Sequence, residues 1–202
     1  MSKLLIATNN AGKLTEYHEL LQNPGLELLT LNQVGITEDI PETGHSFLEN
    51  AIFKAKACSS LSGIITLADD SGLEVSALGG APGVKSKRYA GTHASDEERI
   101  RFLLDKLSKA PVANRQARFV CYIAISYPDG PTFTCSGTVE GEIASCPQGS
   151  NGFGYDPVFF IPSLGRTMAQ LSFEEKNMIS HRAVAAREAS KIIGDLYGGM
   201  SN

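Results

Sequence analysis

Residues 64–75 read Ile-Ile-Thr-Leu-Ala-Asp-Asp-Ser-Gly-Leu-Glu-Val, and this stretch decides the fold. Its β-branched, apolar first half predicts a buried strand that stops at Asp69 and Asp70. Two adjacent carboxylates at the end of a strand repel each other and lose hydration, unless a cation or hydrogen-bond donors lie beside them. A divalent metal with oxygen ligands would meet that need, and a plain Asp-Asp-Ser-Gly surface turn is the alternative.

The bulk composition is that of an ordinary globular protein of 202 residues, long enough for one large domain. A net charge of −4 disfavours nucleic acid as a partner, because no whole face would be basic. The four cysteines form no Cys-x-x-Cys pair, which argues against a zinc ribbon or a disulfide framework. The sequence shows no secretion signal and no stretch long enough to cross a bilayer, so we expect a cytoplasmic protein with no membrane partner.

The N-terminal segment predicts a strand, a polar loop and a helix. Residues 4–7 are apolar, residues 8–13 read Thr-Asn-Asn-Ala-Gly-Lys, and apolar residues then recur at helical spacing from 14 to 21. Backbone N–H groups at the start of a helix attract anions, and Lys13 would add a point charge for phosphate. The spacing is not that of a P-loop, and an ordinary helix cap explains the loop about as well.

A second group of charged residues follows. An acidic loop contains Glu42, and Ser46 opens a predicted helix with the spacing of a capping box. Glu42 is either a solvated loop charge or a further carboxylate that faces the Asp pair. Lys54 lies on this helix and is uninformative by itself, because most helical lysines face solvent.

The middle of the chain completes an α/β pattern. We expect residues 73–78 to form the other arm of a hairpin after the Asp pair, and a helix with one apolar stripe to follow from Asp96. Residues 118–127 and 132–143 read as two long strands around a Pro-Asp-Gly-Pro turn. Because no repeat or linker-like segment appears, we expect one domain over residues 1–202, with this hairpin forming a second lobe.

The last third contains a glycine-rich loop, which reads Gly-Ser-Asn-Gly-Phe-Gly-Tyr-Asp-Pro over residues 149–157. Glycines beside Phe153 would let the backbone approach a ligand, and an exposed aromatic between them would suit stacking on a flat base. A plain turn with a core-facing Phe is the alternative. His181 and Arg182 then begin the final helix, where the dipole disfavours cations. Something negative or rich in acceptors is therefore expected nearby, and a carbonyl or phosphate of a ligand would serve.

Short motifs are spread over nearly the whole chain. They are Thr8-x-Asn10-x-x-Lys13, Glu42-Thr43-Gly44, Glu49-Asn50-Ala51, Asp69-Asp70-Ser71-Gly72-Leu73, Phe153-Gly154-Tyr155-Asp156-Pro157 and Ser180-His181-Arg182. Each is weak alone, but in this order and spacing they closely resemble the inosine triphosphate pyrophosphatase family, whose members are also called XTP/dITP diphosphatases.

The resemblance implies an α/β fold, in which a curved mixed β-sheet with flanking helices forms two lobes around a central nucleotide cleft. It implies Mg²⁺-dependent hydrolysis of deaminated purine nucleoside triphosphates (ITP, dITP and XTP) to the monophosphate and pyrophosphate. Members of the family are typically homodimers. The alternatives are a nucleotide-binding sensor of the same fold without turnover, and an enzyme that acts on other modified nucleotides.

The resemblance also implies roles for single residues. Glu42 and Asp70 would hold Mg²⁺, with Asp70 as the proton acceptor for the attacking water and Asp69 raising its basicity or sharing the metal. Lys13 would serve catalysis at the phosphates, because positive charge placed where negative charge develops drives phosphoryl transfer. Further substrate-binding residues would be Thr8, Asn9, Asn10, Ala11, Gly12, Lys54, Ser71 and Lys176.

Recognition of the base would lie in the glycine-rich loop and the start of the final helix. Hypoxanthine and xanthine carry an acceptor oxygen at C6 where adenine carries a donor, and a buried mismatched polar group costs about 1–3 kcal/mol. Rejection of guanine needs a second device, such as exclusion of its 2-amino group. The residues implied are Phe153, Gly154, Tyr155, Asp156, His181 and Arg182.

Overall fold

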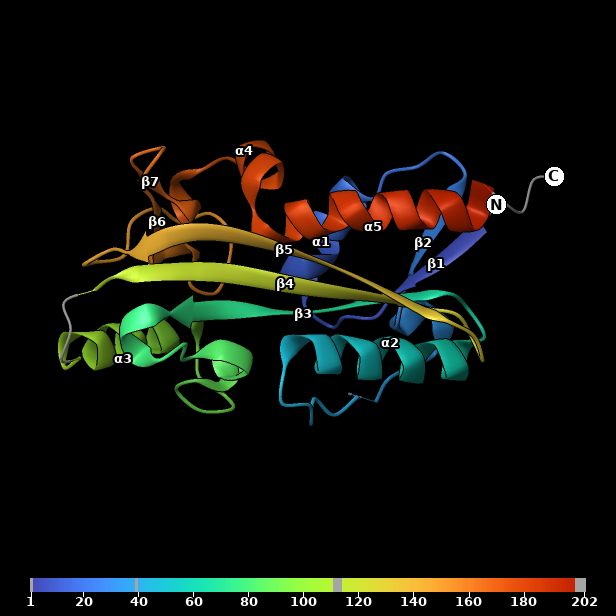
Figure 1. Cartoon of the computed structure of the whole chain (residues 1–202), viewed down its shortest axis with the longest axis horizontal. Helices are drawn as coiled ribbons and strands as arrows, with labels where there is room; N and C mark the ends of the chain where they lie inside the picture. Colours follow the sequence, from blue (N-terminus) through green and yellow to red (C-terminus); the bar gives the residue numbers. More distant parts are fainter. Residues whose placement is uncertain (1, 39, 111–113, 199–202) are drawn as a thin grey trace. The chain divides into compact units, whose positions relative to one another are not determined.

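The computed structural model describes residues 2–38, 40–110 and 114–198 (Figure 1). These residues form a seven-stranded sheet in the order β2-β1-β3-β4-β5-β6-β7. Its strands pair both parallel, as in β1 with β2 and β3, and antiparallel, as in β6 with β5 and β7. The predicted α/β class with a mixed sheet and flanking helices is therefore confirmed.

The chain divides into two compact units. Unit 1 comprises Met1–Asp70, Cys121–Gly137 and Arg182–Asn202, and unit 2 comprises Ser71–Val120 and Thr138–His181. Three strands contribute residues to both units: β3 (Thr66–Val75), β4 (Gln116–Ser126) and β5 (Thr132–Ile143). A nucleotide cleft around which two lobes are arranged stays a prediction.

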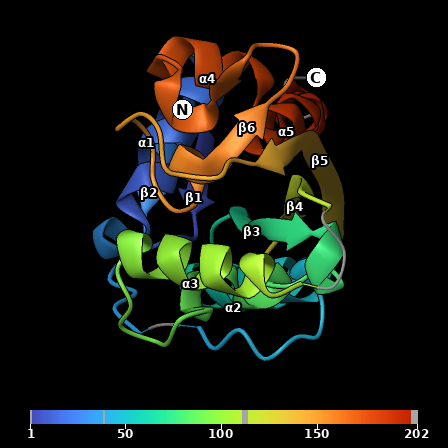
Figure 2. The same ribbon diagram turned by 90° about the vertical axis from the view of Figure 1, so that its left-hand side faces the viewer.

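Unit 1 also contains β1 (Ser2–Ile6), α1 (Ala11–Leu20), β2 (Leu26–Thr30), α2 (Phe47–Ser62) and nearly all of α5 (His181–Gly198). Figure 2 shows β1 and β2 side by side, in the parallel register that pairs Leu4 with Leu28. Among the described residues, no helix is both long and apolar enough to cross a membrane.

The strands of unit 1 bury both faces, because their side chains alternate. Leu4 and Ile6 of β1 pack in one apolar cluster with residues of α1 and α5, here called the α1/α5 face. Leu5 and Ala7 pack on the opposite face with residues of α2, here called the α2 face. In Figure 1 these helices accordingly lie on opposite sides of β3. Helices therefore pack against both faces of these strands, and side chains from either helix layer can contribute to a functional site.

Unit 2 has one apolar core, which joins the second half of β3 to α3 (Asp96–Ser108) and to the segment around β6 (Phe159–Ile161). Ile100, Leu103 and Leu107 of α3 all belong to this core, as the predicted stripe requires. The remaining elements of unit 2 are β7 (Arg166–Thr167) and α4 (Phe173–Ile179), with short 3₁₀ turns between them. Figures 1 and 2 both show α3 and α4 on opposite sides of the strands of this unit.

One prediction about the decisive stretch is wrong. We expected a strand that stops at Asp69 and Asp70, followed by a separate hairpin arm, but β3 runs without interruption from Thr66 to Val75. Both carboxylates are buried inside the strand, with 1% and 6% exposure. The local preference of Asp, Ser and Gly for turns is weaker here than the stabilisation from strand pairing and burial in the sheet. Local sequence does not reveal that pairing. The surface-turn alternative is thereby excluded.

Candidate active site

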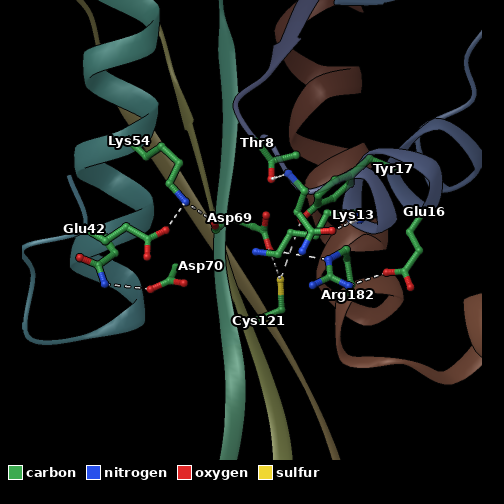
Figure 3. A network of polar contacts seen from close by, with 12 residues as sticks. Thr8, Lys13, Glu16, Tyr17, Glu42, Lys54, Asp69, Asp70, Cys121 and Arg182 are labelled. Carbon is green, nitrogen blue, oxygen red and sulfur yellow. Dashed lines mark hydrogen bonds and ion pairs between the residues drawn. The ribbon is translucent and has the colours of Figure 1, made fainter. Parts of the chain in front are cut away.

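Asp69 and Asp70 point to opposite faces of β3 (Figure 3). The alternation is continuous with the apolar residues before them, since Leu67 packs on the α1/α5 face and Ala68 on the α2 face. Two carboxylates that are adjacent in sequence therefore have separate surroundings, and each is described below by its own partners.

On the α2 face, Asp70 meets an amide and a second carboxylate. Its Oδ2 atom accepts a hydrogen bond of 2.9 Å from Nδ2 of Asn50, which is itself buried on α2. Lys54 lies one helical turn further along α2 and pairs through Nζ with Oε1 of Glu42 at 2.7 Å. The same ammonium donates to the backbone oxygen of Asp69 at 3.1 Å. Lys54 thus ties the Glu42 loop to β3, and it is not the solvent-facing lysine that is usual on a helix.

The loop that carries Glu42 is attached to α2 close to Asn50. The amide of Gly44 donates to Oδ1 of Asn50 at 2.8 Å, and a Cβ at this glycine would lie 2.7 Å from the same oxygen. Ser46 caps the helix by accepting from the amide of Glu49 at 3.2 Å. One asparagine therefore connects the Glu42 loop to Asp70, and only glycine fits where the loop approaches it.

The electrostatics of the α2 face shift the pKa of Asp70 upward. Burial, and then the negative charge of Glu42, raise the pKa of Asp70 above its usual value, against the lowering effects of Lys13 and Asn50. Burial lowers the pKa of Lys54, but Glu42 and Asp69 outweigh it and the net shift is upward. A bound cation would offset the repulsion between Asp70 and Glu42 that contributes to the raised pKa of Asp70.

The donor set on the α2 face fits a magnesium ion. Mg²⁺ prefers oxygen ligands and is usually held by one or two carboxylates, with water and substrate phosphates at its other positions. Figure 3 shows Glu42 and Asp70 on the same side of β3. Within the described ranges, no group of three His, Cys, Asp or Glu side chains is placed to hold a metal. A two-carboxylate site completed by phosphate oxygens is therefore the arrangement that these residues suit.

On the α1/α5 face, Asp69 is an acceptor for several groups at once. Its Oδ2 atom lies 2.8 Å from Nζ of Lys13, 3.6 Å from Nε of Arg182 and 3.7 Å from Sγ of Cys121. The side chain of Asp69 is fully buried, whereas that of Lys13 keeps 13% of its exposure. The ion pair with buried Asp69 therefore fixes the position of the Lys13 ammonium group, while part of the Lys13 side chain stays exposed to solvent.

The helix that presents Lys13 begins as predicted. The side chain of Asn10 caps α1 by accepting from the amide of Lys13 at 3.2 Å, and Thr8 accepts from the amide of Asn10 at 3.2 Å. Ala11 and Gly12 are the first two residues of α1, and Asn9 lies in the loop before it. The ordinary helix cap that we left open as an alternative is present, and it brings Lys13 to Asp69.

Arg182 is neutralised by protein carboxylates. It pairs with Glu16 of α1, and both side chains are buried, with 1% and 3% exposure (Figure 3). Burial lowers the pKa of Arg182, but Glu16 and Asp69 together raise it well above the ordinary value. The negative group that we expected beside the start of the final helix is thus present as these two carboxylates. A hydrogen bond from Arg182 to a base stays a prediction.

The electrostatics of the α1/α5 face are the reverse of those around Asp70. Burial would raise the pKa of Asp69, but Lys13, Arg182 and Lys54 outweigh it and hold that pKa well below its usual range. Asp69 is therefore an anion at every physiological pH. Its Oδ1 atom has no hydrogen-bond partner among the described residues. The structure does not test whether Asp69 shares the metal, and that role stays a prediction.

In unit 2, two of the residues predicted for the base site, Phe153 and Asp156, lie together with Lys176. Lys176 forms a buried ion pair with Oδ2 of Asp156 at 2.5 Å, and its ammonium lies 4.6 Å from the centre of the Phe153 ring. The same Oδ2 atom accepts from the amide of Phe153 at 3.0 Å. Lys176, which we predicted as a cation for phosphate, is thus grouped with residues predicted for the base.

The other predicted residues of unit 2 are placed as follows. Tyr155 is buried and donates its hydroxyl to the backbone oxygen of Ser86 at 3.0 Å. The His181 ring stacks on Phe119, with 4.7 Å between ring centres and 15° between planes. Ser71 is partly buried in β3, next to Asp70. The structure does not test their predicted contacts with a substrate.

Comparison with known proteins decides the family. A sequence model of the Ham1 family matches residues 4–192. The chain belongs to the Ham1 family. It is 46% identical over 193 residues to a Bacillus subtilis (strain 168) protein named dITP/XTP pyrophosphatase, with 96% of this chain and 98% of the relative covered. It is 45% identical to a Shigella flexneri protein of the same name, covering 93% of this chain and 95% of the relative.

Solved Ham1 structures share the fold. A HAM1 protein from Coxiella burnetii superposes with a TM-score of 0.89 at 44% identity, covering 96% of this chain and all of that one. The Staphylococcus aureus Ham1 protein gives a TM-score of 0.85 at 44% identity, over 95% of this chain and 98% of that one. The resemblance inferred from the motifs is therefore confirmed.

Sequence reasoning did not single out three residues of this Ham1 site. Asn50 was part of a quoted motif, and its place one helical turn before Lys54 could have marked it. Glu16 stands three residues after Lys13 and so shares its helix face, which is the only local signal for it. Cys121 carried no signal, because its closeness to Asp69 depends on the pairing of distant strands.

Proposed function

We propose that this Ham1 protein hydrolyses deaminated purine nucleoside triphosphates, dITP, ITP and XTP, to the monophosphate and pyrophosphate. The observation that carries the proposal is the α2 face of β3, where Asp70, with its raised pKa, lies with Glu42 and Lys54. The names of the Bacillus subtilis and Shigella flexneri relatives support the same reaction. An acidic pair beside cations is the equipment that cleavage of a phosphoanhydride bond requires.

Asp70 would act as the proton acceptor for the attacking water. A general base works best when its pKa approaches the working pH, and in the metal-free protein burial and Glu42 shift the pKa of Asp70 in that direction. The hydrogen bond from Asn50 holds one carboxylate oxygen and so orients the other. Asn50 would therefore set the direction in which Asp70 takes its proton.

Glu42 and Asp70 would hold a magnesium ion, which when bound neutralises phosphate charge and polarises the phosphorus for attack. Lys54 would bind phosphate oxygens on the same face while keeping Glu42 in place. Lys13 would grip the phosphate tail from the start of α1, where backbone N–H groups add their own attraction for anions. In this proposal Asp69 orients Lys13, through the 2.8 Å ion pair, and takes no proton itself.

For the base we keep Phe153, His181 and Arg182 as candidates, together with the rest of the glycine-rich loop. A donor from His181 or Arg182 would pair with the C6 oxygen of hypoxanthine or xanthine and would meet a donor in adenine. Such a mismatch costs about 1–3 kcal/mol for each buried group, which is enough to select the base. Guanine would be excluded by its 2-amino group.

The test is pyrophosphate release from dITP, XTP, dATP and dGTP by the purified protein with Mg²⁺. We expect much faster release from dITP and XTP than from dATP and dGTP, and similar rates for all four would contradict the selectivity. Protein with Asp70→Asn, purified in the same way, controls for a contaminating phosphatase. If the wild-type protein binds dITP but releases no pyrophosphate, the sensor alternative holds.

We further propose that the protein works as a homodimer in the cytoplasm. The family resemblance supports the dimer, and the absence of a membrane-spanning helix among the described residues is consistent with this location. Light scattering on the eluting protein would give the mass to compare with the 21.6 kDa of one chain. A mass of one chain at micromolar concentration would contradict the dimer.

A further inference from the structure

The glycine-rich loop of unit 2 is attached to the first turn of α3. The amide of Gly154 donates to Oδ2 of Asp96 at 2.6 Å, a short hydrogen bond of the kind that carboxylates make with backbone N–H groups. The other oxygen of Asp96, Oδ1, pairs with Arg99 one turn along the helix. Asp96 therefore connects the loop to a guanidinium group on α3.

Arg99 is held in turn by backbone groups. Its Nη1 atom donates to the backbone oxygen of Lys87 at 3.0 Å and also to that of Ala94. Its side chain keeps only 15% of its exposure. Next to Gly154, the hydroxyl of Tyr155 reaches the backbone oxygen of Ser86. Two successive loop residues are thus attached to the segment that runs from residue 86 to residue 99.

The helix itself does not need Asp96 as a cap. Ser95 accepts from the amide of Glu98 at 3.2 Å, and the Glu98 carboxylate accepts from the amide of Ser95 at 2.7 Å, which completes a capping box. A carboxylate in the first turn gains a modest benefit from the helix dipole. The direct contacts of Asp96 are with the loop and with Arg99, and these contacts give it a role beyond the helix start.

We propose that Asp96 is a positioning residue for substrate recognition, because it fixes the Gly154 amide and so sets the direction of the Phe153 ring. The inference rests on the proposed function, in which Phe153 contacts the purine base. Gly154 has a φ of +66°, a conformation in which few residues other than glycine are stable, so the loop can present its amide to Asp96 in this way.

The hydrogen bonds of the loop also limit which of its groups can contact the base. The amides of Phe153 and Gly154 both donate to carboxylates, of Asp156 and Asp96 respectively. These two N–H groups are therefore not donors to the C6 oxygen of a base. Of these two residues, the Phe153 ring is the part that remains for the base, and its direction depends on the carboxylates of Asp156 and Asp96.

The experiment compares Asp96→Ala with Asp105→Ala. Asp105 is a matched control, because it is also on α3 and also pairs with a basic residue, Lys109, but it lies near the opposite end of the helix and both partners are exposed. For Asp96→Ala we expect KM for dITP to rise about tenfold while kcat stays within about twofold, because the loop orients substrate and takes no part in the chemical step. For Asp105→Ala we expect no change in either constant.

A second measurement reads the contact directly and needs no substrate. In ¹⁵N-labelled protein the Gly154 amide proton should resonate downfield and exchange slowly, and Asp96→Ala should abolish both features. Asp96→Asn, which keeps an acceptor for the amide but loses the charge, should lie between the two and serves if the Ala variant does not fold. Arg99→Met in the Asp96→Ala background should add little, since both act through one contact.

The outcomes separate the inference from the proposed function. If wild-type protein releases no pyrophosphate from dITP, the proposed function fails, and the NMR comparison still decides whether Asp96 holds the loop. If the Gly154 resonance and exchange are the same in Asp96→Ala, the inference is overturned. It is equally overturned if the resonance changes but KM does not, or if kcat falls while KM is constant.

Discussion

The two faces of β3 give the same residue type opposite properties. Asp69 lies between two cations, Lys13 and Arg182, and its pKa is held below the usual range. Asp70 is buried beside a second carboxylate, Glu42, and its pKa is raised. The first is a permanent anion that orients other groups, and the second is suited to accept a proton. The difference teaches that the partners of a carboxylate, more than its position in the sequence, decide its chemistry.

The largest expected effect comes from Asp70→Asn. If Asp70 is the proton acceptor, kcat for dITP should fall by about 10³-fold or more, since an amide cannot take the proton. Binding of the nucleotide should stay within about tenfold. Quenched-flow or coupled pyrophosphate assays and calorimetric titration measure the two quantities.

Asp70→Asn should not destabilise the protein, in contrast to the replacement of Asp69 on the α1/α5 face. A raised folded-state pKa means that ionised Asp70 costs folding free energy at neutral pH, so its replacement should raise the free energy of unfolding measured in EDTA. Asp195→Asn, at an exposed carboxylate of α5, is the control for both measurements. Full activity of Asp70→Asn would place the base elsewhere.

The second effect concerns stability, through Asp69→Asn. Removing the anion leaves Lys13 and Arg182 without their shared partner, and breaking a buried ion pair typically costs about 3–5 kcal/mol. The depressed pKa of Asp69 means that this contribution is present above the ordinary carboxylate pKa and is lost as pH falls through the folded-state value. The gap between wild type and variant should therefore be constant from pH 7 to about 5 and should shrink below about pH 4. Urea unfolding at a series of pH values measures it.

Asp69→Asn also tests whether Asp69 shares the metal. The concentration of Mg²⁺ that gives half-maximal activity should stay within about twofold of wild type, while kcat/KM falls because Lys13 is no longer oriented. Glu42→Gln, on the other face, should raise that concentration about tenfold. A large rise for Asp69→Asn would make it a metal ligand and would end the comparison between the two faces.

The smallest effect is electrostatic and runs through Glu42. Its negative charge raises the pKa of Asp70, so Glu42→Gln in the metal-free protein should lower that pKa. A ¹³C NMR titration of the Asp70 carboxyl carbon gives the value, and the Asp69 resonance serves as the internal reference. An upward shift of the Asp70 pKa would contradict the arrangement on the α2 face.

Part of the site could be predicted from local pattern. Strand, polar loop and helix around Lys13 followed from apolar spacing and are present, and the structure identifies Asn10 as the cap of the helix. The Glu42 loop and the start of α2 at Ser46 followed from the capping pattern. The end of the strand at Asp69 was predicted wrongly, because acidic and glycine residues favour turns locally. In the structure β3 pairs with β1 only at Thr66 and Leu67, but it continues beside its other neighbour, β4, as far as Val75.

The sequence by itself determined the family and the chemical equipment: two carboxylates in a row, a lysine at a helix start, and alternation that sends neighbouring side chains to opposite faces. The family resemblance implied that Asp70 is the proton acceptor, and only the tertiary structure showed the different surroundings of the two carboxylates. Lys13 and Arg182 come from distant parts of the chain to one face, and Glu42 and Asn50 come to the other. Because a pKa depends on the charges and burial around a group, folding shifts the pKa values of these two identical residues in opposite directions.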